Sequence, residues 1–180
     1  MRFFLPAGVG AVLMSVLGVG WFTQPDRYAR GYAPEQPIAY SHQLHAGTLS
    51  IPCLYCHWAA RKSRHAGVPS LETCMGCHQV TKTDSPEIQQ LAALYESGEP
   101  IRWRRVHALP DHTFFDHRPH VNAGVECQTC HGEVQTMEVL EQRMSMRMSN
   151  CLECHRQARW AVPEGSAIER AAENCWTCHR

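Results

Sequence analysis

Cysteine and histidine side chains recur in one spacing along this chain. Every one of its ten cysteines belongs to a C-x-x-C-H motif, and the motif occurs five times. Two thiols three positions apart can each form a thioether with one haem vinyl group, and the adjacent histidine can then bind the iron. The motifs predict five covalently bound haem c groups, held by Cys53, Cys56, Cys74, Cys77, Cys127, Cys130, Cys151, Cys154, Cys175 and Cys178, with proximal iron ligands His57, His78, His131, His155 and His179.

Zinc sites and disulfide frameworks also use closely spaced cysteines. A zinc ribbon combines C-x-x-C units in pairs, and five is an odd number. Disulfides need no histidine, yet a histidine follows every C-x-x-C unit although only 12 of the 180 residues are histidine. The histidines therefore favour haem over both alternatives.

The histidines outside the motifs are candidates for the sixth iron ligand. An aromatic-x-His-x-x-His stretch precedes both the first and the third motif, and this lead-in resembles that of small class III multihaem cytochromes. The candidate distal ligands are His42, His45, His65, His107, His117 and His120. These six candidates already exceed the five distal ligands that five haems require. We therefore expect His112 to bind no iron.

The resemblance also implies which haem each paired histidine serves. In class III cytochromes the first histidine of the lead-in binds the haem just downstream, and the second reaches a different haem. Carried over, His42 would serve the Cys53 haem and His117 the Cys127 haem. His45 and His120 would cross to neighbouring haems.

Methionine is the other possible sixth ligand, because four methionines precede the fourth motif. A methionine ligand would raise the potential of that haem relative to sites with two histidines. Alternatively, these side chains pack against a porphyrin face, since methionine fills irregular apolar gaps. The residues concerned are Met137, Met144, Met146 and Met148.

The order of motifs reveals an internal repeat. H-x-x-H followed by two C-x-x-C-H motifs occurs at about 41–80 and again at about 113–156, and a terminal haem site lies at about 170–180. Because the 140 residues of 41–180 provide only about 28 per haem, the porphyrins must themselves form the core. We expect a mostly α and irregular multihaem cytochrome c fold organised around the haems.

Two helices are predicted outside the motifs. Ser85 can cap a helix over 85–98 that has proline at its first position and ends at Gly98. A second helix is expected from Glu133 to about Met146.

The N-terminal segment is apolar. Phe3 to Phe22 contain no charged side chain and would span about 30 Å as a helix, so we expect a single transmembrane anchor over 1–25 and a linker over 26–40. The rival interpretation is a cleaved secretory signal. Both place the haem domain on the periplasmic or extracytoplasmic side of the cell membrane.

Charge and ligand pattern limit the classes of function. The 17 basic and 17 acidic side chains balance, which argues against a nucleic-acid binder. A catalytic haem needs an exchangeable axial position, and no C-x-x-C-K variant is present. We therefore expect electron transfer, with no catalytic site of the chain's own.

The stretches Glu99–Asp111 and Phe114–Gly132 resemble the pentahaem cytochrome c subunit of alternative complex III, a quinol-oxidising respiratory assembly. That resemblance implies membrane lipid and several protein partners: an iron–sulfur subunit, membrane quinol-binding subunits and a monohaem cytochrome c. The acceptor would be a cytochrome or a terminal oxidase.

Two other functions remain open. The chain also resembles a self-sufficient tetrahaem membrane quinol dehydrogenase, although that family has a methionine where Ala59 stands and four haems where this chain has five motifs. The second is an electron-entry subunit of a periplasmic reductase.

Overall fold

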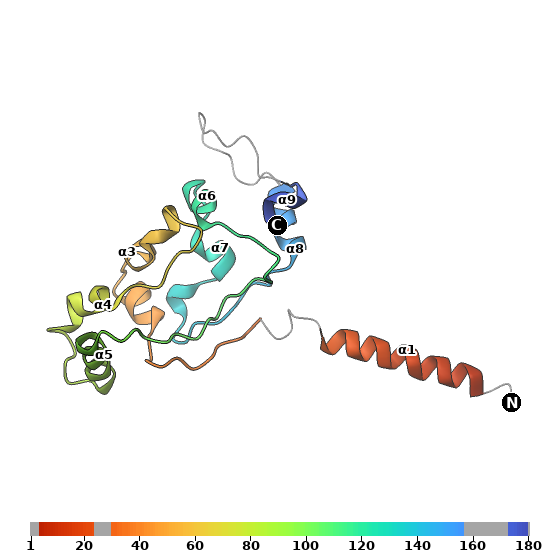
Figure 1. The fold of residues 1–180 in the computed structure, drawn as a ribbon, viewed down its shortest axis with the longest axis horizontal. Helices are drawn as coiled ribbons and strands as arrows, with labels where there is room; N and C mark the ends of the chain where they lie inside the picture. The colour runs from red at the N-terminus through yellow and green to blue at the C-terminus, as the bar shows by residue number, and fades with distance from the viewer. Residues whose placement is uncertain (1–3, 24–29, 157–172, 180) are drawn as a thin grey trace.

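The computed structural model describes residues 4–23, 30–156 and 173–179. Within these ranges the chain forms short helices joined by irregular segments, and no β-strand is present (Figure 1). An isolated bridge joins Thr113 to His179. The expected mostly α and irregular fold is therefore confirmed for the described residues.

The elements follow one another in a simple order. They are α1 (Phe4–Phe22), the π-helical turn η1 (Gln43–Thr48), α3 (Cys53–Cys56), the 3-10 turn η2 (Trp58–Arg61), α4 (Leu71–His78), α5 (Pro86–Ser97), α6 (His117–Asn122), α7 (Cys127–His131), the 3-10 turn η3 (Val134–Thr136), α8 (Met148–Arg156) and α9 (Cys175–Cys178).

Helix α1 occupies the predicted membrane anchor. Its 19 residues rise roughly 28 Å at 1.5 Å per residue, slightly less than the roughly 30 Å of a bilayer's hydrocarbon core. Among the residues described, no helix is both long and apolar enough to cross a membrane. The structure therefore does not support the transmembrane anchor predicted over 1–25.

Each C-x-x-C pair lies on a helix. Helices α3, α7 and α9 begin at the first cysteine of their motif, whereas α4 and α8 contain theirs in their last turns. Residues three apart on a helix lie on the same face, so both thiols of a motif point to the same side. The helices thus present each pair of cysteines to one partner.

The apolar core is small and lies at one end of the haem domain. Ile38, Met75 and Leu91 are its buried members, and they join α4 to α5. Helix α5 lies within the 85–98 segment, with Ser85 before it and Gly98 after it at a left-handed φ of 72°. Most of the remaining helices have no buried residue, which fits a domain whose interior is completed by cofactors.

The second predicted helix, from Glu133 to about Met146, is wrong. Only Val134–Thr136 form a helical turn there. Beyond this turn the backbone forms hydrogen bonds with distant segments. The Gln43 amide donates to the Met137 carbonyl, and the Gln142 amide donates to the Tyr32 carbonyl. These long-range bonds use groups that a helix would pair locally.

Part of the predicted 26–40 linker belongs to the folded domain. The Gln36 side chain donates to the Arg104 carbonyl and accepts from the Arg104 amide, at 3.0 and 2.9 Å. Ile38 is buried in the core. Residues 30–40 therefore help to fix the segment that precedes the second repeat.

Turns η1 and η3 approach each other closely at Gly47. A methyl group placed on Gly47 would run into the Gln135 carbonyl oxygen, whereas one on Gly18 of α1 would meet nothing within 4 Å. Only glycine therefore allows η1 to pack this tightly on η3.

Replacing Gly47 with alanine should force the two turns apart. We expect Gly47→Ala to lower the free energy of unfolding by about 1–3 kcal/mol, as overpacking usually does. Gly18→Ala is the matched control and should leave it unchanged. Chemical denaturation followed by haem absorbance measures both, and equal stability of the two variants would contradict the prediction.

Candidate haem-binding sites

The five C-x-x-C-H motifs are numbered here as sites 1 to 5 in chain order, with proximal histidines His57, His78, His131, His155 and His179. All ten motif cysteines have free thiols. They are therefore available for the thioether bonds that attach haem c. What distinguishes a haem site further is the arrangement of the histidines.

Four proximal histidines face a second imidazole ring across a gap of constant width. The ring centres are 6.2 Å apart for His45 and His78, 6.3 Å for His117 and His131, 6.0 Å for His120 and His155, and 5.7 Å for His112 and His179. Two imidazoles that bind one metal ion from opposite sides, with metal–nitrogen bonds of about 2 Å, have ring centres roughly 6 Å apart. The pairs therefore fit the two axial ligands of a haem iron.

Hydrogen bonds to backbone carbonyls orient several of these rings through their Nδ1 atoms. Such a bond fixes the tautomer and leaves Nε2 free for a metal. The Nδ1 partners are the carbonyls of Ser41 for His45, Gly67 for His57, Thr81 for His78, Arg64 for His117, Asp116 for His120 and His112 for His179. Both proximal and distal candidates are thus preset for coordination through Nε2.

At site 1, His42 is the distal candidate. Burial lowers the pKa of His42 to about 4, and the nearby His57 and His45 rings add to the decrease. Its Nδ1 is buried without a hydrogen-bond partner. His42 is consequently neutral at pH 7, which is the form of histidine that binds metals.

The residue in front of each H-x-x-H pair packs in the same way in both repeats. Tyr40 lies edge-on to His42 at 4.9 Å and along the face of His45 at 4.5 Å. Phe115 contacts His117 and His120 at the same two distances. The aromatic ring therefore acts as a spacer that sets the angle between two histidines serving two different sites.

The structure brings His112, which we expected to bind no iron, to site 5. The centre of its ring lies 5.7 Å from that of His179, with an angle of 18° between the two planes. The Phe114 amide donates to the Cys178 carbonyl at 2.7 Å, next to the Thr113–His179 bridge. This pairing joins segments 67 positions apart, so no local motif signals it.

His65 and His107, two other distal candidates, do not form such pairs. The His107 ring is edge-on to His131 at 4.5 Å, which leaves no room for an iron between them. Its Nε2 is buried without a partner. His65 is exposed, and within the described ranges no ring contact joins it to a proximal histidine.

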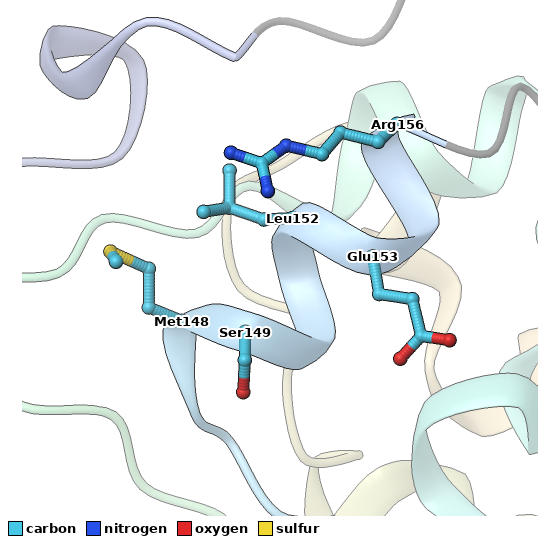
Figure 2. A pocket seen from close by; sticks show the side chains of 5 residues that line it. All are labelled: Met148, Ser149, Leu152, Glu153 and Arg156. Carbon is cyan, nitrogen blue, oxygen red and sulfur yellow. The ribbon is translucent and has the colours of Figure 1, made fainter.

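The candidate methionine ligands have other surroundings. Met137 is buried beside Gly132 and packs in the interior. Met148 lines an open hollow on α8 together with Ser149, Leu152, Glu153 and Arg156 (Figure 2). Met148 is 62% exposed, so it does not pack in the interior as Met137 does.

Comparison with known proteins places these motifs in context. Residues 113–180 match the family model described as cytochrome c7 and related cytochrome c. The whole chain is similar to the menaquinone reductase multihaem cytochrome c subunit of Nitratidesulfovibrio vulgaris, with 27% identity over 197 aligned positions that cover 97% of this chain and 89% of the relative. Both similarities support covalently bound haem c as a cofactor of this chain.

Removing the His112 imidazole should leave one iron with a single protein ligand. We expect His112→Ala to convert one haem from low spin to high spin, visible in the absorbance and EPR spectra of the oxidised protein. His65→Ala is the matched control and should leave all haems low spin. A fully low-spin His112→Ala protein would contradict the assignment to site 5.

Proposed function

We propose that this multihaem c-type cytochrome carries five haem c groups and is an electron-transfer subunit of a membrane respiratory complex linked to the quinone pool. The observation that carries the proposal is the pairing of histidine rings at separations of 5.7 to 6.3 Å at four sites. The similarity to a menaquinone reductase subunit along almost the whole chain supports the link to quinone.

The protein's own groups hold and tune the haems. Each bound haem supplies an iron that accepts and releases one electron. The cysteines would attach each haem, and the proposed histidine pairs that would hold the irons are His57 with His42, His78 with His45, His131 with His117, His155 with His120 and His179 with His112. Two protein ligands on each iron would leave no position for a substrate, so the role that we propose is electron transfer without a catalytic site of the chain's own.

Burial keeps the ligands in the form that coordination needs. Burial lowers the pKa of His131 to about 4, and the neighbouring His107, His117 and His57 rings lower it further. Burial also lowers the pKa of His120. Neutral imidazoles are strong iron ligands at pH 7, so the protein environment favours low-spin haems.

For the direction of transfer we propose quinol oxidation, as in alternative complex III. The resemblance of Glu99–Asp111 and Phe114–Gly132 to its pentahaem subunit supports this direction. The electrons would then pass to a cytochrome or a terminal oxidase. The second candidate is quinone reduction, which is favoured by the name of the Nitratidesulfovibrio relative.

We further propose that the chain works on the periplasmic or extracytoplasmic side of the cell membrane, with membrane subunits, an iron–sulfur subunit and a monohaem cytochrome c as partners. The apolar residues of α1 support contact with membrane subunits, because Val12, Val16 and Leu17 are each more than 60% exposed. Exposed apolar surface of this extent marks a site of protein or lipid contact.

Purification of the native assembly in mild detergent tests the proposed partners and direction. We expect membrane and iron–sulfur subunits to co-purify, and the assembly to oxidise a quinol with a cytochrome c as acceptor. Net reduction of menaquinone by reduced cytochrome c would instead establish the second candidate. Quinol oxidation by the isolated chain alone would contradict its role as a subunit.

The number of haems is tested on the isolated chain. The pyridine haemochrome assay against protein mass should give five haems per chain, and four in a Cys175→Ala, Cys178→Ala double variant. A count of four or fewer in the unsubstituted protein would contradict the use of all ten cysteines.

A further inference from the structure

The two H-x-x-H lead-ins are each fixed by the other repeat. The first, which includes η1, packs on η3, the turn that follows site 3. The second, which forms α6, packs on η2, the turn that follows site 1. Each repeat therefore supports the distal histidines of the other.

Equivalent positions make these reciprocal contacts. Asn122 lies five residues after His117, and its side chain donates to the carbonyl of Arg61, four residues after His57. Gly47 lies five residues after His42 and approaches the carbonyl of Gln135, which is four residues after His131. The correspondence of both offsets is what a two-fold relation between the repeats requires.

A second set of contacts obeys the same rule. Arg64 lies seven residues after His57. Its backbone carbonyl accepts hydrogen bonds from the amide and the Nδ1 of His117, at 3.1 and 2.9 Å. Its guanidinium donates to the Phe115 carbonyl. Glu138, seven residues after His131, accepts from the Ser41 hydroxyl, which precedes His42. Both residues thus hold the lead-in of the opposite repeat.

The junction lies between sites 1 and 3. The turn after site 1 packs on the second lead-in, whose His117 pairs with His131 of site 3, and the turn after site 3 packs on the first lead-in. Because each contact has its counterpart in the other repeat, the approximate two-fold axis passes between these two sites.

The other sites extend outward from this junction. Tyr40 contacts both His42, the distal candidate of site 1, and His45, whose ring pairs with His78 of site 2. Phe115 likewise contacts both His117, which pairs with His131 of site 3, and His120, which pairs with His155 of site 4. From site 4 to site 5, Arg156 at the end of α8 forms an ion pair at 3.5 Å with Glu173, two residues before Cys175. Each relation joins two neighbouring motifs.

From these contacts we propose that the five attachment sites form one row in the order 2–1–3–4–5, with an approximate two-fold axis between sites 1 and 3. The row differs from the order in the sequence, in which site 2 would stand between sites 1 and 3. In Figure 1, α4 with site 2 and α9 with site 5 lie at opposite ends of the haem domain, and α3 and α7 lie between them.

The order has a functional consequence that rests on the proposed electron-transfer role. Sites 2 and 5 are the ends of the row, where electrons enter and leave through partner proteins. Sites 1 and 3 lie in the interior of the row. The two-fold axis relates sites 2 and 1 to sites 4 and 3, and site 5 lies outside this symmetric set of four. Trp176 within the site 5 motif is 79% exposed, so this end reaches the protein surface.

Methionine substitution of a distal ligand makes the order measurable. A methionine ligand raises the potential of its haem, so that this haem alone can be reduced and made diamagnetic while the others stay oxidised. The EPR signals of its neighbours then change, because they lose a magnetic partner. We expect His42→Met at site 1 to change the signals of two other haems, and His45→Met at site 2 to change one.

Sequence order predicts the reverse, with one changed signal for His42→Met and two for His45→Met, and that result would overturn the proposal. His65→Met is the control and should change none. Haem counts accompany each spectrum, because fewer than five haems in the unsubstituted protein would count against the proposed function and not against the order.

The unsubstituted protein provides a second test that does not depend on the variants. Anomalous scattering from crystals of the haem-loaded chain locates the irons and the cysteines bound to each haem. We expect the iron of site 1 to lie between those of sites 2 and 3. An iron of site 2 between those of sites 1 and 3 would overturn the proposal.

Discussion

The rest of this structure depends on the need to hold two imidazole rings about 6 Å apart, in line, with a neutral Nε2 on each facing the gap. The proximal ring is positioned by its own short helix. The distal ring must come from elsewhere, and in this chain it comes from two short lead-ins and from His112. Few side chains are buried because the backbone is arranged around these pairs and not around an apolar core.

This requirement explains why the repeats exchange support. A lead-in of about eight residues is too short to form a stable helix alone. It becomes rigid by bonding to the turn after a motif of the opposite repeat, as Arg64 does for His117 and Glu138 for Ser41. The two-haem units thereby become interdependent. Because a single aromatic ring spaces two histidines that we propose to serve different sites, it would hold neighbouring haems at a set separation.

Some features were predictable because the chemistry is local. The spacing in C-x-x-C-H places two thiols on one helix face, and the fold class, the haem cofactor and the helix within 85–98 follow from patterns a few residues long. The helix expected from Glu133 to about Met146 was wrong because Met137 and Gln142 bond to segments around Gln43 and Tyr32, and no local pattern records such bonds. The membrane anchor expected over 1–25 is likewise unsupported.

The sequence by itself thus determined the chemistry. It places thiols and imidazoles at spacings that suit haem c, in two repeats of two motifs each and in a fifth motif after them. Only the tertiary structure decided which histidine faces the fifth motif. His112 reaches His179 across 67 positions, whereas His65, which follows His57 by eight residues, makes no such pair in the part of the chain described. The physical reason is that an axial pair needs closeness in space, and the bonds between repeats, not the distance along the chain, determine which rings meet.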